Sequence, residues 1–140
     1  MSVAAVLSPV FALIALLFIL TFRMALTRVA SIKAGKVKMK DIALGQNAWT
    51  PSIQQTSNAY ANNLQQPLLF YALVAFALIT KKADMLFVIM SWLYVASRYA
   101  HAYIHVTSNH VPNRFNAFAA GVLILALMWI IFAARILGEF

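Results

Sequence analysis

Cysteine is absent from this 140-residue chain, and Asp and Glu together number only three. Without cysteine there can be no disulfide, no cysteine-ligated metal and no cysteine nucleophile, so any thiol chemistry requires a thiol that arrives with a ligand. The acids, Asp41, Asp84 and Glu139, all lie outside the apolar runs. We therefore expect neither a paired-carboxylate mechanism nor a carboxylate-bridged dimetal site.

Charge is scarce as well, at 10% of the residues, whereas 64% are hydrophobic. A soluble domain of this length lacks the interior volume for so much apolar side chain, so the composition indicates a single-domain integral membrane protein. The net charge of +8 favours contact with anionic lipid headgroups. A nucleic-acid partner is not expected, because the basic residues flank apolar runs rather than forming one face.

Four apolar segments predict an all-α, up-and-down four-helix bundle across the membrane. The expected helices cover residues 3–28, 58–80, 84–106 and 112–136. The run Val3–Phe22 carries no charge and reaches across about 30 Å at ~1.5 Å per residue. A cleaved signal peptide is the alternative for this run, but a basic n-region and an obvious small-residue cleavage site are missing.

The longest polar connection carries four lysines in its first half, Lys33, Lys36, Lys38 and Lys40. By the positive-inside rule this loop is cytoplasmic, and both termini lie on the non-cytoplasmic side of a multi-pass protein. Lys81 and Lys82, in the short second turn, oppose this orientation only weakly. A ligand site at the lysine cluster is the less favoured alternative to a topology signal.

Ionisable side chains interrupt the third apolar segment, where a membrane span ordinarily has none. Tyr94, Arg98, His101 and His105 recur at spacings of four, three and four, which places them on one side of a helix. An Arg within a membrane helix normally faces the protein interior or a wet cavity. We therefore interpret this stripe as the wall of a site, with Arg114 just past the following turn.

A second polar stripe, Asn58, Asn62 and Gln65, lies on the expected second helix. The topology brings it to the cytoplasmic end, together with the stripe of the third helix and with Arg23 and Arg28. So many donors without a negative charge predict a pocket for a small anion. The alternative for the amides is interhelical hydrogen bonding, at roughly 1 kcal/mol or less per contact.

Metal binding is not predicted, although His101 and His105 are four residues apart and could hold a metal or haem. Neither a cysteine nor a nearby carboxylate completes a zinc site, and His110 lies too far along the chain to share their face. A hydrogen-bonded core histidine is the alternative interpretation of His105.

The run from Asn62 to Tyr71, NNLQQPLLFY, resembles the helix-two signature of the MAPEG family, the membrane-associated proteins of eicosanoid and glutathione metabolism. Arg98, His101, His105 and Arg114 keep the offsets at which prostaglandin E synthase members carry Arg, His, Tyr and Arg. The resemblance covers nearly the whole chain and is to bacterial-type members. It implies a homotrimer of four-helix protomers in a bacterial inner membrane.

The resemblance also implies glutathione as cosubstrate, held between subunits near the cytoplasmic face. Arg114 would stabilise its thiolate, which would attack a lipophilic electrophile or hydroperoxide arriving from the bilayer. A cation beside a thiol lowers the thiol's pKa and so raises the fraction of nucleophile. The residues implied to contact the ligand are Arg28, Asn62, Gln65, Arg98, His101 and His105.

Three positions depart from the family pattern: Gln65 replaces a Glu, Asn58 replaces an Arg, and His105 replaces a Tyr. A Gln cannot pair with the ammonium of glutathione as a carboxylate does. The competing hypothesis is therefore a non-catalytic membrane protein that binds a lipid or another anionic ligand, or an accessory subunit of a membrane complex. A transporter is less favoured, because no broken-helix pair or inverted repeat is present.

Overall fold

The computed structural model describes residues 1–45 and 48–138, and Glu139 lies outside them. The elements of these described residues are all helical: α1 (Val3–Lys33), a 3₁₀ turn (Met39–Asp41), α2 (Pro51–Gln65), α3 (Pro67–Ile79), α4 (Met85–Val106) and α5 (Val111–Leu137). Because α2 and α3 follow one another as two halves of a single span, the predicted four-helix, all-α bundle is confirmed.

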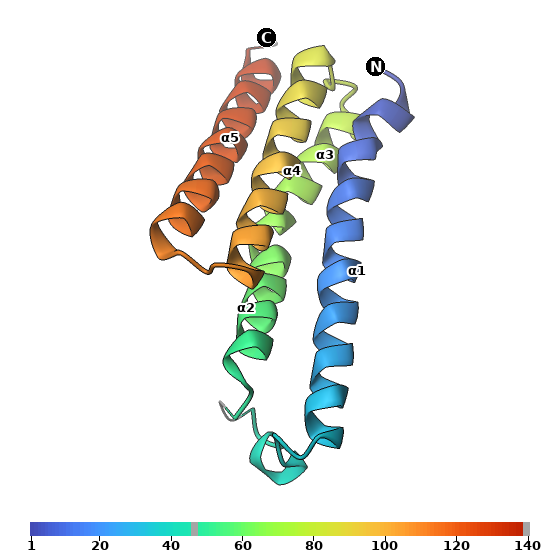
Figure 1. Cartoon of the computed structure of the whole chain (residues 1–140). Coiled ribbons are helices and arrows are strands. Elements are labelled where there is room, and N and C mark those ends of the chain that lie inside the picture. Colours follow the sequence, from blue (N-terminus) through green and yellow to red (C-terminus); the bar gives the residue numbers. More distant parts are fainter. Residues whose placement is uncertain (46–47, 139–140) are drawn as a thin grey trace.

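The bundle has up-and-down topology (Figure 1). Both termini and the α3–α4 turn lie at one end, and the α1–α2 loop lies at the other. The α4–α5 turn lies only partway along α1, so the last turns of α1 and the first turns of α2 project beyond it. The sequence is consistent with this shape. The uncharged run of α1 stops at Phe22 but the helix continues to Lys33, so the end of α1 lies beyond its apolar part.

The end of α1 is set by backbone geometry rather than by the first charges, which is why the helix continues past Arg28. Gly35 has a positive φ of 71°, and its N–H donates to the carbonyl of Ile32 at 3.0 Å. The N–H of Lys36 donates to the carbonyl of Ser31, also at 3.0 Å. This pair of bonds is a Schellman motif, which satisfies the last carbonyls of the helix.

The expected second helix differs from the structure at its start and in its middle. It begins at Pro51 rather than near Asn58. Proline suits the first turn of a helix, and the polar residues between Pro51 and Asn58 can be helical because this part of the chain lies outside the apolar run. It then breaks between Gln65 and Pro67, where proline provides no N–H for the helical ladder.

Within the described ranges, three spans are long and apolar enough to cross a membrane: α1, the α2–α3 pair and α5. The polar stripe makes α4 less hydrophobic than these three spans. Even so, α4 is the central helix and packs against α1, α2 and α5. Many large apolar side chains face outward, among them Phe11, Phe18, Leu123 and Ile130. An apolar exterior around a polar-striped central helix is the arrangement of a protein that lipid surrounds, so the chain is a membrane protein.

Close packing of α4 against α5 depends on Gly121, which is buried. A Cβ at this position would stand 2.7 Å from Oγ of Ser97 and 3.8 Å from the ring of Tyr94. Tyr94 is itself fully buried, and its ring stacks on Phe70 of α3 with a centroid distance of 4.8 Å. A small residue at 121 therefore sets the distance between α5 and the centre of the bundle.

We predict that Gly121→Leu lowers the stability of the detergent-solubilised protein by about 2 kcal/mol, the usual cost of overpacking a close interface. Ala126→Leu is the matched control, because Ala126 is on the same helix but exposed. The measurement is the midpoint of thermal unfolding in mild detergent. Equal midpoints for the two variants would show that α5 does not pack closely at Gly121.

Candidate functional site

Arg98 of α4 is fully buried and points at the junction of α2 and α3. Its Nη1 donates to Oε1 of Gln66 at 2.7 Å, and its Nε and Nη2 lie 3.4 Å and 3.3 Å from Oδ1 of Asn63. Nη2 also donates to Oδ1 of Asn62. Three side-chain amides, all neutral, therefore surround one guanidinium.

The local sequence explains how these amides are presented. Asn62 and Asn63 lie in the last turn of α2, and Gln66 lies at the break before Pro67. The amide nitrogen of Asn63 donates to the carbonyl of Ala59 at 2.8 Å, which leaves its oxygen to accept from Arg98. Asn63 and Gln66 thus lie on the face of the α2–α3 span that meets Arg98 of α4.

The described residues offer Arg98 no carboxylate. Asp84 precedes it on α4 by about four helical turns, or roughly 21 Å, and pairs with Arg135. Asp41 is exposed in the α1–α2 loop. A buried charge without a countercharge is costly, so amide dipoles alone compensate Arg98 within this part of the protein. The surrounding interior is therefore favourable for an anion.

An open cavity of about 280 Å³ adjoins this cluster and is lined by Asn62, His101, His105, Val111, Arg114, Phe115 and Phe118. Asn62 is shared with the Arg98 cluster, which lies directly behind it. The floor of the cavity is polar, whereas Val111 and Phe115 at its edge are exposed and apolar. One cavity thus presents a cationic wall and an apolar rim.

The two histidines form the deep wall. They are 3% and 6% exposed, and their rings lie 5.5 Å apart in an edge-on arrangement. His101 also contacts the ring of Phe118, with centroids 5.9 Å apart. Their Nδ1 atoms are buried and have no hydrogen-bond partner among the described residues. The described residues contain no group of three metal-ligating side chains.

Arg114, in the first turn of α5, is held by the turn that precedes the helix. Its Nη1 donates to Oδ1 of Asn109 at 2.6 Å. Asn109 has a φ of +50°, a conformation that asparagine tolerates better than most residues, and its N–H donates to the carbonyl of Ile104 at 2.7 Å. The residue that shapes the α4–α5 turn therefore also orients the cavity's arginine.

The structure brings together five of the residues that the sequence selects: Asn62, Arg98, His101, His105 and Arg114. Gln65 is exposed at the end of α2, and its neighbour Gln66 bonds Arg98 instead. Arg28 lies on the projecting part of α1, where it donates to Oγ of Ser57 at 2.9 Å and stands 4.7 Å above the ring of Trp49.

Sequence reasoning missed Asn63, Gln66 and Asn109. Asn63 and Gln66 are three residues apart, a helical spacing equal to that of Asn62 and Gln65, so a pattern search alone does not separate the two pairs. For Asn109 the available signal was a polar turn residue five positions before an arginine, which is a weak one.

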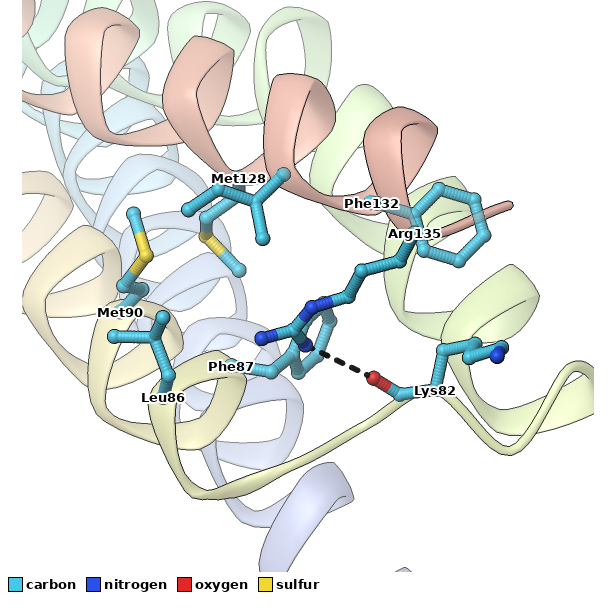
Figure 2. A pocket seen from close by; sticks show the side chains of 8 residues that line it. Lys82, Leu86, Phe87, Met90, Met128, Phe132 and Arg135 are labelled. Atoms are coloured by element: carbon cyan, nitrogen blue, oxygen red, sulfur yellow. Dashed lines mark hydrogen bonds between the residues drawn. The ribbon is translucent and has the colours of Figure 1, made fainter. Parts of the chain in front are cut away.

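A second pocket lies at the opposite end of the bundle, between α4 and α5 (Figure 2). Its walls are apolar, with Phe87, Met90, Met128 and Phe132 among them, and Arg135 closes its mouth. Nη2 of Arg135 lies 2.7 Å from Oδ2 of Asp84, and this hydrogen bond lowers the pKa of Asp84 below its ordinary value. Because Arg135 is already paired with a carboxylate and the walls are apolar, this pocket is less suited to an anion than the Arg114 cavity.

Comparison with sequence models of protein families shows a match to the MAPEG family over residues 6–134. The match includes α2 to α4, the α4–α5 turn and all the residues of the Arg114 cavity. A comparison with curated proteins finds no match.

We predict that Gln66→Glu stabilises the ligand-free protein by about 1 kcal/mol at neutral pH, because a carboxylate forms a stronger hydrogen bond with Arg98 than an amide does. Gln65→Glu is the matched control, with the same change in charge at an exposed neighbouring position. The measurement is the midpoint of thermal unfolding in detergent. If Gln65→Glu stabilised the protein and Gln66→Glu did not, the assignment of Gln66 to Arg98 would be wrong.

Proposed function

Since it matches over nearly its whole length, the chain belongs to the MAPEG family, and on that premise we propose that it is a glutathione-dependent membrane transferase or peroxidase. Its substrates would be lipophilic electrophiles or hydroperoxides. The observation that carries the proposal is the cavity itself, where Arg114, the histidines and Asn62 face a space without a carboxylate and with apolar residues at its edge.

In this proposal Arg114 stabilises the thiolate of glutathione. A guanidinium close to a thiol lowers the thiol's pKa, which raises the concentration of the nucleophile at neutral pH. The hydrogen bond to Asn109 holds the guanidinium in place before the ligand binds, so little ordering is needed during the reaction. In a transfer reaction the thiolate sulfur bonds to the electrophilic carbon, and the leaving group departs with the bonding electrons.

The two reactants would reach the cavity by different routes. The cavity is lined by Val111 and Arg114 at the start of α5, so it lies beside the α4–α5 turn. This turn points toward the end of the bundle that carries the lysine-rich loop, which we assign to the cytoplasm from the positive-inside rule. Glutathione would then enter from the cytoplasm. The exposed apolar side chains Val111 and Phe115 would admit a lipophilic substrate from the bilayer.

We extend the proposal to a homotrimer with glutathione between protomers. The cavity is open on one side, and Arg28 and Gln65 lie outside its lining. In a trimer Gln65, which is exposed, would contact ligand held by a neighbouring protomer, and Arg28 would do so by exchanging its bond to Ser57. Two observations support the trimer: the chain belongs to the family, and the residues of one protomer do not fully enclose the cavity.

A non-catalytic protein that binds a lipid or another anionic ligand is the second candidate. The observation that favours it is the lack of a carboxylate among the described cavity residues, which leaves the ammonium of glutathione without a charged partner. Native mass spectrometry of gently extracted protein distinguishes the two functions. A retained lipid, with no thermal shift at millimolar glutathione, would support the second.

We predict that Arg114→Ala lowers kcat/KM for glutathione conjugation of a chlorodinitrobenzene-type electrophile by about tenfold or more, equivalent to about 1.4 kcal/mol of transition-state stabilisation. Arg114→Lys should retain part of the rate, because it keeps the charge but not the planar fork. Arg135→Ala, which removes the same charge at the far end of the bundle, is the control and should retain the full rate. An unchanged rate in Arg114→Ala would exclude Arg114 as the thiolate's partner.

A further inference from the structure

The two arginines of α5 have partners of different kinds. Arg135, in the last turn, pairs with the carboxylate of Asp84 at 2.7 Å. Arg114, in the first turn, donates to the side-chain amide oxygen of Asn109 at 2.6 Å, and it forms no ion pair within the described ranges. The charge of Arg135 is therefore neutralised by its partner, whereas Arg114 is held by its partner and keeps its whole charge.

Helix stability accounts for the position of Arg135 but not for that of Arg114. A cation is favourable at the negative C-terminal end of a helix dipole and unfavourable at the positive N-terminal end. The N-cap of α5, His110, makes no side-chain capping hydrogen bond. The first turn of α5 thus carries an arginine where the helix is already positive, a position that suits the binding of an anion.

Asn109 meets two requirements at once. Its φ of +50° is left-handed, and in this conformation its N–H donates to the carbonyl of Ile104 at 2.7 Å and closes the end of α4. Its side chain also provides the oxygen that receives Arg114. Glycine would meet the first requirement alone. Aspartate tolerates the same conformation and provides an oxygen, but it adds a negative charge.

Asn109 acts through Arg114 rather than on the ligand, because it does not line the cavity. The other ionisable side chains of the lining are His101 and His105 of α4, and Arg98 lies behind Asn62. Neither histidine nor arginine becomes an anion. A carboxylate at position 109 would therefore be the first negative charge beside the described part of this cavity.

We propose that Asn109 is a positioning residue that orients Arg114 without neutralising it, so that the full charge of the guanidinium remains for the bound thiolate. This inference rests on the proposed thiol chemistry. A carboxylate in the same place would hold the guanidinium more strongly, but it would also compete with the thiolate for the positive charge. Stability and chemistry should therefore respond in opposite directions to a negative charge at this position.

The test uses the full chain in mild detergent with saturating glutathione. Asn109→Asp adds the charge, and Asn109→Gly keeps the left-handed turn but removes the amide. Ser108→Ala is the control in the same turn, because the Oγ of Ser108 accepts from the N–H of His110 at 3.4 Å and its removal leaves the bond to Arg114 intact. The measurements are the midpoint of thermal unfolding without ligand, the thiolate absorbance as a function of pH, and kcat.

We expect Asn109→Asp to raise the midpoint of thermal unfolding and the apparent pKa of the bound thiol together, with about tenfold less thiolate at neutral pH. Its conjugation rate should recover as the pH rises above the new pKa, where the thiol ionises again. Asn109→Gly should lower kcat several-fold, and Ser108→Ala should leave kcat and the thiol pKa unchanged. His110 is exposed and common to all these proteins, so its titration cancels in the comparison.

If Asn109 served only to shape the turn, activity would follow stability. A lowered midpoint or an unchanged thiol pKa in Asn109→Asp, or a loss of rate that high pH does not restore, would therefore overturn the inference. The two levels of the account fail differently. The absence of a thiolate band in the unmodified protein would reject the proposed function and this inference with it. A band that Arg114→Ala abolishes, but that has the same pKa in Asn109→Asp as in the unmodified protein, would reject the inference alone.

Discussion

A single buried guanidinium with only neutral partners governs the arrangement of this bundle. Arg98 has no carboxylate within reach among the described residues, and three amides from the α2–α3 junction take its hydrogen bonds. Those amides come from the end of α2 and from Gln66, directly before Pro67. The helix that carries Arg98 is not apolar enough to rank as a span by itself, so its place in the membrane depends on the three helices around it.

The shortage of acidic partners for the cations also makes the two ends of the molecule different. At the end with the termini, Arg135 is neutralised by Asp84 and the nearby pocket is apolar (Figure 2). At the other end no ion pair is found among the described residues, and a cavity there is lined by Arg114, Asn62 and the two histidines. With only three acids in the chain, most of the positive charge must be balanced by ligands, lipids or ions. The proposed thiol site follows from this imbalance.

Composition and periodicity were enough to predict the four helices and the polar stripe of α4, because helical spacing decides which residues share a face. The family was recognised from the resemblance of two motifs, not from periodicity. Periodicity was not enough to choose Gln66 over Gln65, since the pairs Asn63/Gln66 and Asn62/Gln65 have the same spacing and the choice depends on which face of the α2–α3 span meets α4. The continuation of α1 to Lys33 was missed because charge marks the membrane boundary, whereas Gly35 ends the helix. Asn109 was missed because its role requires a left-handed turn that places its amide against Arg114.

The central claim is that the cationic cavity holds an anionic sulfur, and thiolate absorbance in the ultraviolet tests it most directly. Glutathione is added to the solubilised protein at neutral pH, and the difference spectrum is compared with that of Arg114→Ala. The account predicts a thiolate band that saturates with glutathione for the unmodified protein and is absent or greatly reduced for the variant. Bound glutathione without a thiolate band, or an equal band in both proteins, would contradict it.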